Sequence, residues 1–342
     1  MKEMSNKLYA ENLSLLTIAI PTYNRAEYLD LCLSRIFDEI NSLSLSRRCL
    51  VSVYVSNNAS TDNTSEVLSK YKLSSDFNFV FVNNSINIGG DKNIIQCYLS
   101  ALSPYVWVLG DDDVILSGGL EIVLNALIKK KDVDILYLSG YSYSNSYLDE
   151  PIIGRGRTGL TEFSNPLDFV RRTHIMLTFI TALVVRSGVC LTPYDEIVQG
   201  TYLSQMSWIL SLIRDGKKFL IINDRVYAAK IENSGGYGAV QVFGNNLSNI
   251  SRSILCSNLN LANAIENGAI VMWFPIYIVN IRAGSAVGFD GENTHLDLRR
   301  VYKNNWRYYL FLAPLVLLPA LLVPTYFKFI RLIRKIFHFW LI

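Results

Sequence analysis

The chain has 342 residues, half of them hydrophobic, and a formal net charge of +3. That length and composition allow a sizeable core, either as one large α/β domain with an appendage or as two modest domains. The five cysteines are widely scattered with no short pairs, so they indicate neither a zinc site nor a disulfide framework, and a reducing cytosol is the default expectation.

We expect no secretory signal in the amino-terminal segment. Residues 1–12 are polar and mixed in charge, and the apolar run 13–20 is too short for a signal and lacks a basic lead. We therefore expect the chain to start in the cytoplasm.

Up to residue 140, short apolar runs alternate with helical patterns. The pattern predicts strands over residues 15–20, 50–56, 79–82, 105–109 and 135–138. It predicts helices over residues 26–43, 62–71, 91–102 and 120–130. This βαβ series is typical of an α/β fold with a mostly parallel, right-handedly connected sheet.

Three consecutive carboxylates, Asp111, Asp112 and Asp113, follow the predicted strand 105–109. Like charges side by side repel, so a cation or hydrogen-bond donors must offset the cost. The carboxyl ends of strands are where open α/β sheets bind ligands, and a divalent ion carrying phosphates fits that position. The alternative is a solvated acidic turn.

Polar segments also follow the first three predicted strands, at residues 21–25, 56–62 and 87–93. Each alone is compatible with an ordinary loop, in which Ser60 caps a helix or residues 87–90 turn the chain. Together with the acids, these segments resemble the donor half of family-two glycosyltransferases, which have the GT-A (nucleotide-diphospho-sugar transferase) fold. The resemblance covers about residues 14–140.

Four shorter segments, at residues 57–62, 87–93, 110–113 and 233–237, resemble the branch that contains abequosyltransferases and related dideoxyhexose transferases of O-antigen assembly. The resemblance implies a set of donor-binding residues: Pro21, Thr22, Tyr23, Asn24, Arg25, Asn57, Asn58, Gly89, Lys92, Asn93, Asp111 and Asp112. It also implies that Asp113, with Asp111, holds Mg²⁺ or Mn²⁺, which would neutralise the diphosphate leaving group.

One departure from the family pattern concerns the base of the donor. Where the family commonly has an Asp that accepts the N3–H of uracil, this chain has Asn57. An amide offers a donor and an acceptor and so satisfies both N3 and N4 of cytosine, whereas a carboxylate would repel the N3 lone pair. We therefore hypothesise a CDP-sugar donor. An Asn carbonyl also accepts from uracil, and Asn58 is an alternative reader of the base.

A second departure concerns the general base. Family members usually carry a Glu-Asp pair about a dozen residues before a Gly, and counting back from Gly216 those positions fall near Ser204 and Gln205. Neither side chain can act as a base. The nearest acids are Asp195 and Glu196, which we nominate in that order as catalytic residues. The alternative is a solvated pair in a loop.

The following region continues the domain. The pattern predicts a helix over residues 202–215 and strands over 219–222 and 225–229, which gives a GT-A domain over 1–240 with an acceptor half at about 141–240. Gly235 and Gly236 would let backbone amides approach an anion, with Lys230 as a donor-binding counter-charge. The alternative is a flexible connector. The three histidines share no metal-ligand spacing.

The remaining residues, 241–342, form a predicted helical C-terminal region. Residues 297–342 carry a net charge of +7, which leaves −4 for residues 1–296. The uncharged stretch 308–327 is about as long as a bilayer crossing requires. Three prolines interrupt it and positive charge flanks both ends, which favours a re-entrant or interfacial segment over a simple span.

The last residues, 326–342, predict a basic amphipathic helix on anionic lipid, because their basic residues recur at helical intervals among apolar ones. The alternative is a helical hairpin packed on the protein's own core.

These observations favour a membrane-associated, metal-dependent, inverting glycosyltransferase acting on a lipid-linked oligosaccharide at the cytoplasmic face of the inner membrane, with a role in lipopolysaccharide synthesis. We expect no nucleic-acid partner. A sugar nucleotidyltransferase is a second possibility, but it normally has a Gly-rich basic loop where this chain has residues 21–25. A non-catalytic sugar-nucleotide-binding membrane protein is a third, because the Glu-Asp pair is missing.

Overall fold

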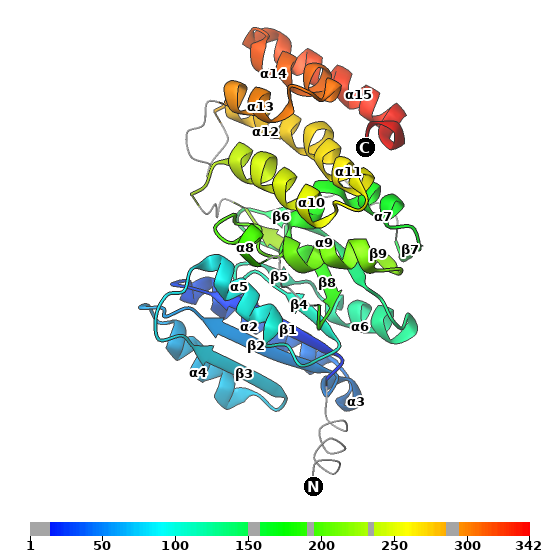
Figure 1. Cartoon of the computed structure of the whole chain (residues 1–342). Coiled ribbons are helices and arrows are strands. Elements are labelled where there is room, and N and C mark those ends of the chain that lie inside the picture. Colours follow the sequence, from blue (N-terminus) through cyan, green and yellow to red (C-terminus); the bar gives the residue numbers. More distant parts are fainter. Residues whose placement is uncertain (1–13, 150–157, 190–194, 232–235, 285–293) are drawn as a thin grey trace. The chain divides into compact units, whose positions relative to one another are not determined.

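The computed structural model describes residues 14–149, 158–189, 195–231, 236–284 and 294–342 (Figure 1). The chain divides into two compact units that interleave along the sequence. The sheet unit comprises residues 1–164, 179–192 and 215–231, and the helical unit comprises residues 165–178, 193–214 and 232–342. The domain boundary at residue 240 stays a prediction.

The sheet unit is built on a nine-stranded sheet. Its strands are β1 (Leu16–Thr22), β2 (Val51–Asn57), β3 (Asn78–Asn83), β4 (Tyr105–Val108), β5 (Val114–Ile115), β6 (Ile135–Tyr143), β7 (Leu160–Phe163), β8 (Leu183–Arg186) and β9 (Phe219–Lys230). Its α-helices are α2 (Ala26–Ser42), α3 (Leu45–Arg48), α4 (Thr64–Ser74), α5 (Gly90–Leu99) and α6 (Gly119–Lys129), and a short 3₁₀ helix, η2, spans Ile180–Ala182. The predicted elements up to residue 140 are therefore confirmed to within a few residues.

The strand order is β3-β2-β1-β4-β8-β6-β9-β5, with β7 beside β9. The four strands β3, β2, β1 and β4 are all parallel, as predicted. Beyond β4 the sheet is mixed, because β8 runs antiparallel to both β4 and β6 while β6 and β9 are parallel. A parallel arrangement is thus confirmed for the donor half, and the whole is a mixed α/β sheet.

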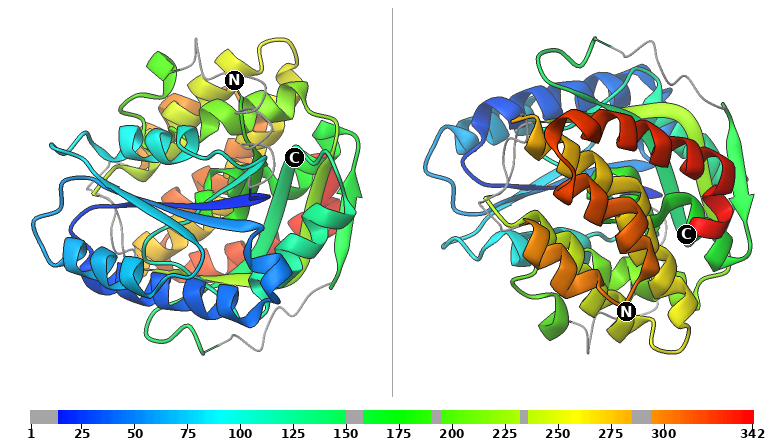
Figure 2. Two further views of the ribbon diagram at one scale, coloured as in Figure 1. Left: turned by 90° about the horizontal axis from the view of Figure 1, so that it is seen from below. Right: turned by 90° about the horizontal axis from the view of Figure 1, so that it is seen from above.

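Helices cover both faces of this sheet (Figure 2). The apolar sides of α2, α4 and α6 pack with alternate residues of the strands into one large core, which includes Leu33, Leu68, Val123 and Trp107. Helix α5 contacts β1, β2 and β4 but contributes nothing to that cluster, so it lies on the opposite face. Alternation of side chains along each strand is what lets a single strand serve both layers.

One pair of predicted strands is a single strand. Residues 219–222 and 225–229 both belong to β9, whose pairing with β6 shifts register on either side of Ser139. This irregularity absorbs the polar residues 223–225 without ending the strand.

The helical unit contains the remaining elements. They are α7 (Pro166–Thr173), η1 (His174–Thr178), α8 (Asp195–Val198), α9 (Met206–Asp215), η3 (Gln241–Asn246), α10 (Leu247–Ile254), α11 (Leu259–Gly268), η4 (Ala269–Trp273), α12 (Phe274–Arg282), α13 (Thr294–Tyr302), η5 (Tyr308–Leu312), α14 (Ala313–Leu317), η6 (Ala320–Leu322) and α15 (Val323–Leu341). The helix predicted from residue 202 begins only at Met206, because Tyr202 has a φ of 61°, which a helix does not accommodate.

The apolar stretch 308–327 is broken, as its prolines predict. Leu318 has an extended backbone just before Pro319, which separates α14 from η6 and α15. The predicted basic helix corresponds to α15, which begins slightly earlier, at Val323, and is kinked at Phe337. Among the described residues, one helical stretch, Leu259–Arg282, is long and apolar enough to cross a membrane, and 67% of its most apolar window is buried in the protein.

Candidate active site

The acid cluster lies where the strand order of the sheet reverses. From β1, the chain adds β2 and β3 on one side and β4 on the other. The carboxyl ends of β1 and β4 therefore flank a topological switch point, the position where open α/β sheets bind ligands. Thr22 ends β1, and Asp111, Asp112 and Asp113 follow β4 shortly after Val108.

Asp111 joins the ends of these two strands. Its Oδ2 accepts a hydrogen bond from the Thr22 hydroxyl at 2.7 Å, and its Oδ1 accepts one from Arg25 Nη1 at 3.1 Å. The same Arg25 nitrogen lies 3.1 Å from Oδ2 of Asp112. One guanidinium, about a third exposed, thus bridges two of the three acids and offsets part of their repulsion.

Asp113 is held by two residues from distant parts of the chain. Its Oδ2 accepts from the Thr181 hydroxyl at 2.5 Å, and its Oδ1 accepts from the backbone N–H of Lys230 at 3.0 Å. Thr181 also accepts the backbone N–H of Gly110 at 3.0 Å. A Cβ added to Gly110 would lie 3.0 Å from Asp113 Oδ2, so a glycine allows the acids to fold back this closely.

Burial dominates the acidity of this cluster. It raises the pKa of Asp111 to about 6, although the nearby Arg25 charge lowers it. Burial and the neighbouring Asp112 raise the pKa of Asp113 to about 8, although hydrogen bonds from Thr181 and Lys230 oppose the shift. Two nearly inaccessible carboxyls therefore hold their protons unusually strongly, which is typical of a site that receives a positively charged group.

The acids suit a hard divalent cation that is shared with a ligand. Among the residues that the structure describes, no group of three or more His, Cys, Asp or Glu side chains could hold a metal by itself. Mg²⁺ is usually held by one or two carboxylates plus substrate phosphates, and each carboxylate oxygen of Asp111 and Asp113 keeps a second lone pair. The donor set therefore fits Mg²⁺ or Mn²⁺, with Asp113 and Asp111 as its predicted ligands.

The loops after β1 and β2 are tied together. Asn24, with a φ of 52°, donates its backbone N–H to Ser60 Oγ, and its side-chain oxygen accepts from the backbone N–H of Thr61 at 2.7 Å. Asp62 accepts from the backbone N–H of Ala26 at 3.0 Å, at the first turn of α2. Pro21 is half-buried within β1, and Tyr23, just after the strand, is exposed.

Asn57 and Asn58 are buried in a network of amides. Asn57 donates from Nδ2 to Asn83 Oδ1 at 2.9 Å and accepts from the backbone N–H of Ser60 at 3.1 Å. Asn58 donates to Asn87 and accepts from the backbone N–H of Ile88. Asn57 is only 1% exposed, so its amide orientation is fixed before any base is bound.

The loop after β3 leads into α5 at Gly89, whose φ of 86° favours glycine. Gly89 donates its N–H to the side chain of Asn87 at 2.8 Å. Lys92 is exposed, whereas Asn93 is buried and exchanges two hydrogen bonds with Ser56 at the end of β2. Asn93 thus fixes α5 to the sheet, while Lys92 is available to a solvent-borne ligand.

Lys230 lies at the end of β9. Its ammonium donates to the carbonyl of Ser144 and sits 5.6 Å from the centroid of the Tyr143 ring. Tyr143 in turn donates from its hydroxyl to the carbonyl of Asp112 at 3.1 Å. The predicted counter-charge is therefore linked to the acids through its backbone, and Tyr143 connects its side chain to the same turn.

The nominated bases lie in the helical unit. Asp195 begins the short helix α8, and Glu196 follows it with an exposed side chain. Ser204 and Gln205, at the positions of the usual Glu-Asp pair, are buried, and Gln205 donates to the carbonyl of Thr178 at 2.7 Å. The predicted glycine loop lies partly outside the described residues, which resume at Gly236.

Sequence reasoning missed Thr181 and Tyr143. Both contact the acid cluster from residues far along the chain, and neither belongs to a recognisable motif. No local signal marked either residue, since the strand predicted over residues 135–138 ends five residues before Tyr143 and Thr181 belongs to no predicted element.

Comparison with known proteins identifies the class. Residues 17–180 match the family model Glycosyl transferase family 2, so this part of the chain is a family 2 glycosyltransferase domain. Abequosyltransferase RfbV of Salmonella typhimurium strain LT2 is 32% identical over 119 residues. That alignment covers 35% of this chain and 34% of the relative, so the chain matches about a third of that protein's length.

Solved structures support the same fold. S. aureus TarS residues 1–349 in complex with UDP has a TM-score of 0.55 and 17% identity, covering 94% of this chain and 90% of that one. The same TarS fragment in complex with UDP-GlcNAc gives a TM-score of 0.54 at the same identity and coverage. The predicted GT-A fold is therefore confirmed, together with the resemblance to abequosyltransferases.

Proposed function

We propose that this protein transfers a sugar from a nucleotide-diphospho-sugar to a lipid-linked oligosaccharide, with a divalent ion and with inversion at the anomeric carbon. The observation that carries this proposal is the buried pair Asp111 and Asp113 at the switch point of a family 2 domain, with Arg25 beside Asp111. When bound, Mg²⁺ or Mn²⁺ would neutralise the charge that develops on the leaving diphosphate.

Several residues have distinct roles in this proposal. Thr22 and Arg25 hold Asp111 in place, while Thr181 and the Lys230 backbone hold Asp113. Such fixed carboxylates need little reorganisation when a ligand arrives. Lys92 and the Lys230 ammonium supply positive charge for the diphosphate.

In an inverting transfer, the acceptor oxygen attacks the anomeric carbon as the bond to the diphosphate breaks on the opposite face. The acceptor hydroxyl loses its proton to a general base. Asp195 is our first candidate for that base and Glu196 the second, because both precede the buried Ser204 and Gln205, which cannot accept the proton.

A CDP-linked donor, carrying a dideoxyhexose such as abequose, is the preferred substrate in this proposal. The partial sequence identity to an abequosyltransferase supports a dideoxyhexose as the transferred sugar. The fixed amide of Asn57 supports cytosine as the nucleobase of the donor. Its remaining N–H and lone pair match the N3 and N4 edge of cytosine.

The C-terminal helix supports a position at the cytoplasmic face of the inner membrane. In α15, exposed apolar side chains alternate with the exposed cations Lys328, Arg331 and Lys335. The exposed apolar side chains within the helix are Phe329, Leu332, Ile336 and Phe337, and Leu321 and Leu322 are exposed just before it. Apolar and basic residues together are typical of helices that lie on anionic lipid. Binding the same surface as a lipid-linked acceptor would raise the effective concentration of that acceptor.

The donor experiment uses the full chain with CDP-, UDP-, GDP- and dTDP-sugars and a membrane extract as the source of acceptor. We expect turnover that stops on chelation and in Asp111→Asn and Asp113→Asn. The control is Asp134→Asn, because Asp134 is a buried carboxyl of the same unit just before the amino end of β6. Turnover that survives chelation and both site variants would contradict the metal site, and tighter binding of UDP than CDP would contradict the base assignment alone.

The base experiment compares Asp195→Asn with Glu196→Gln. A base variant should lose transfer to the acceptor while keeping donor binding and slow donor hydrolysis. Wild-type transfer rates in both variants would remove both candidates. Metal-dependent donor hydrolysis without acceptor would also argue against a non-catalytic binding protein.

A further inference from the structure

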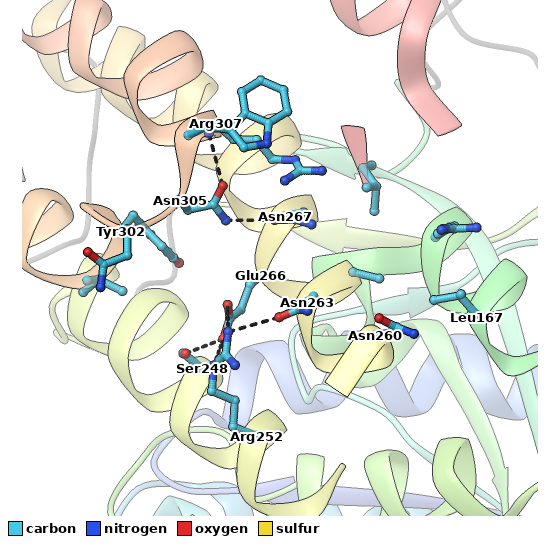
Figure 3. A pocket seen from close by; sticks show the side chains of 16 residues that line it. Leu167, Ser248, Arg252, Asn260, Asn263, Glu266, Asn267, Tyr302, Asn305 and Arg307 are labelled. Carbon is cyan, nitrogen blue, oxygen red and sulfur yellow. Dashed lines mark hydrogen bonds and ion pairs between the residues drawn. The ribbon is translucent and has the colours of Figure 1, made fainter. Parts of the chain in front are cut away.

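The helical unit contains a polar pocket of about 750 Å³ that no step of the proposed reaction uses (Figure 3). Its size falls within the range of roughly 300–1,000 Å³ that is usual for small-molecule sites. It is lined from α7, α10, α11, the end of α13, the turn between α13 and η5, and Ile342. Every lining residue belongs to the helical unit, so the pocket is a feature of that unit alone.

One wall of the pocket is the polar face of α11. Asn260, Asn263 and Asn267 are spaced three and four residues apart, which places them on the same side of the helix. The other side of α11 is apolar and buried, with Leu261 and Ile265 among its residues. The helix is therefore amphipathic, with its amides toward the pocket.

The facing wall is the turn at residues 304–307. Asn305 donates from Nδ2 to Asn267 Oδ1 at 2.9 Å, and its own oxygen accepts the backbone N–H of Arg307 at 3.1 Å. Trp306 is 54% exposed, and the Arg307 guanidinium lies 4.7 Å from the centroid of its ring. A large aromatic ring thus lines the pocket, beside amides whose orientation is fixed.

One ion pair lies within the pocket. Glu266, which is buried, receives two hydrogen bonds of 2.7 Å from Arg252 and a further one from Ser248. Arg252 also donates to Asn263 Oδ1 at 3.1 Å, and Arg307 donates from Nε to the carbonyl of Leu341. Since Glu266 and Arg252 satisfy each other, the amides are the polar groups of the pocket that we expect a ligand to contact.

We propose that this pocket binds a neutral carbohydrate, as a subsite for the acceptor glycan. Sugar hydroxyls both donate and accept hydrogen bonds, and an asparagine amide does the same. The apolar C–H face of a sugar ring packs on an exposed indole such as that of Trp306. Arg171 adds a donor, because its buried Nε has no hydrogen-bond partner among the described residues. The inference rests on the proposed function, since sugar transfer requires a site for the acceptor.

The first experiment measures sugar binding without donor, so that it is independent of catalysis. Saturation-transfer NMR uses the full chain with the methyl glycosides of glucose, galactose, mannose, rhamnose and N-acetylglucosamine at millimolar concentration. We expect at least one glycoside to bind and its affinity to fall about tenfold in Trp306→Ala and in Asn263→Ala. Alanine is a better helix former than asparagine, so Asn263→Ala should leave α11 intact.

Matched controls are Tyr309→Ala and Asn258→Ala. Tyr309 is 57% exposed, and Asn258 immediately precedes α11, but neither lines the pocket. Both controls should bind the glycoside as the wild type does. Equal losses in the controls, or no binding of any glycoside by the wild type, would overturn the inference. Displacement of a bound glycoside by inorganic phosphate would overturn it in favour of an anion site.

The second experiment separates this inference from the proposed function. Trp306→Ala should raise the KM for the glycan acceptor about tenfold while metal-dependent hydrolysis of the donor remains at the wild-type rate. If glycosides bind but no donor is ever turned over, the proposed function fails and a carbohydrate site remains. If donor turnover is normal and Trp306→Ala leaves the acceptor KM unchanged, the pocket is not the acceptor subsite.

Discussion

Replacing Thr181 with valine tests whether the acid cluster depends on a residue outside its own turn. The Thr181 hydroxyl donates to Asp113 at 2.5 Å and accepts the N–H of Gly110 at 3.0 Å. Valine has nearly the same shape but leaves both groups without that partner. Losing a hydrogen bond to a charged group costs about 1.5–3 kcal/mol, and an unsatisfied buried N–H costs about 1–3 kcal/mol. We expect the free energy of unfolding to fall by about 3–5 kcal/mol.

The assay is denaturant unfolding above pH 8, where the Asp113 carboxyl, with a pKa of about 8, is mostly ionised. Donor affinity is measured in parallel and should fall, because Asp113 loses one of its two anchors. Thr17→Val is the control, since Thr17 is equally buried but bonds only to the neutral hydroxyls of Ser52 and Ser103. It should cost about 1 kcal/mol and leave donor affinity unchanged.

Thr181→Ser keeps the hydroxyl and should restore most of the lost stability and affinity. The reasoning is refuted if Thr181→Val is no less stable than Thr17→Val and binds the donor normally.

Three further outcomes follow from the structure. Gly110→Ala should abolish transfer and destabilise the fold by about 1–3 kcal/mol, because the new Cβ would meet the carboxylate of Asp113; an active, stable variant would contradict the packing of this turn. Hydrogen bonds from Thr64 and from the backbone of Ala26 lower the pKa of Asp62, although burial opposes this. Asp62 therefore contributes stability above its unfolded pKa that is lost as pH falls through the folded value. Asp62→Asn should cost about 1 kcal/mol in thermal unfolding at neutral pH and much less in acid, and a pH-independent difference would argue against an ionised Asp62 that accepts these hydrogen bonds. Reversing three charges of α15 changes its net charge by six, so at about 1 kcal/mol per charge it should weaken binding to anionic vesicles by on the order of 10,000-fold, while reversing three exposed lysines of the sheet unit should not. The test variant is Lys328→Glu with Arg331→Glu and Lys335→Glu, and the control is Lys129→Glu with Lys131→Glu and Lys217→Glu.

The helices and strands of the donor half follow from local patterns. Apolar runs bounded by polar loops predicted β1 to β4. The three acids could be identified from the sequence alone because they are adjacent in the chain. The prolines of residues 308–327 likewise predicted the break at Leu318. Patterns of this kind depend on neighbouring residues, so they can be read directly from the sequence.

The role of the nominated general bases cannot be predicted from such local patterns. Asp195 and Glu196 were chosen by their spacing from Gly216, and their role depends on reach to a proton, which spacing does not give. The preference for a cytosine nucleotide is also not fixed by local sequence, because Asn57 is one member of an amide network that includes Asn83.

The sequence by itself determined the parallel strands, the family resemblance and the position of the acids at a strand end. Only the tertiary structure decided what surrounds those acids: Thr181 and Lys230 reach Asp113 from 68 and 117 residues away. It also brought α11 and the turn at residues 304–307 together as a polar pocket. The physical reason is that backbone geometry follows local residue patterns, whereas contacts between distant residues depend on how whole elements pack, which no short segment of sequence contains.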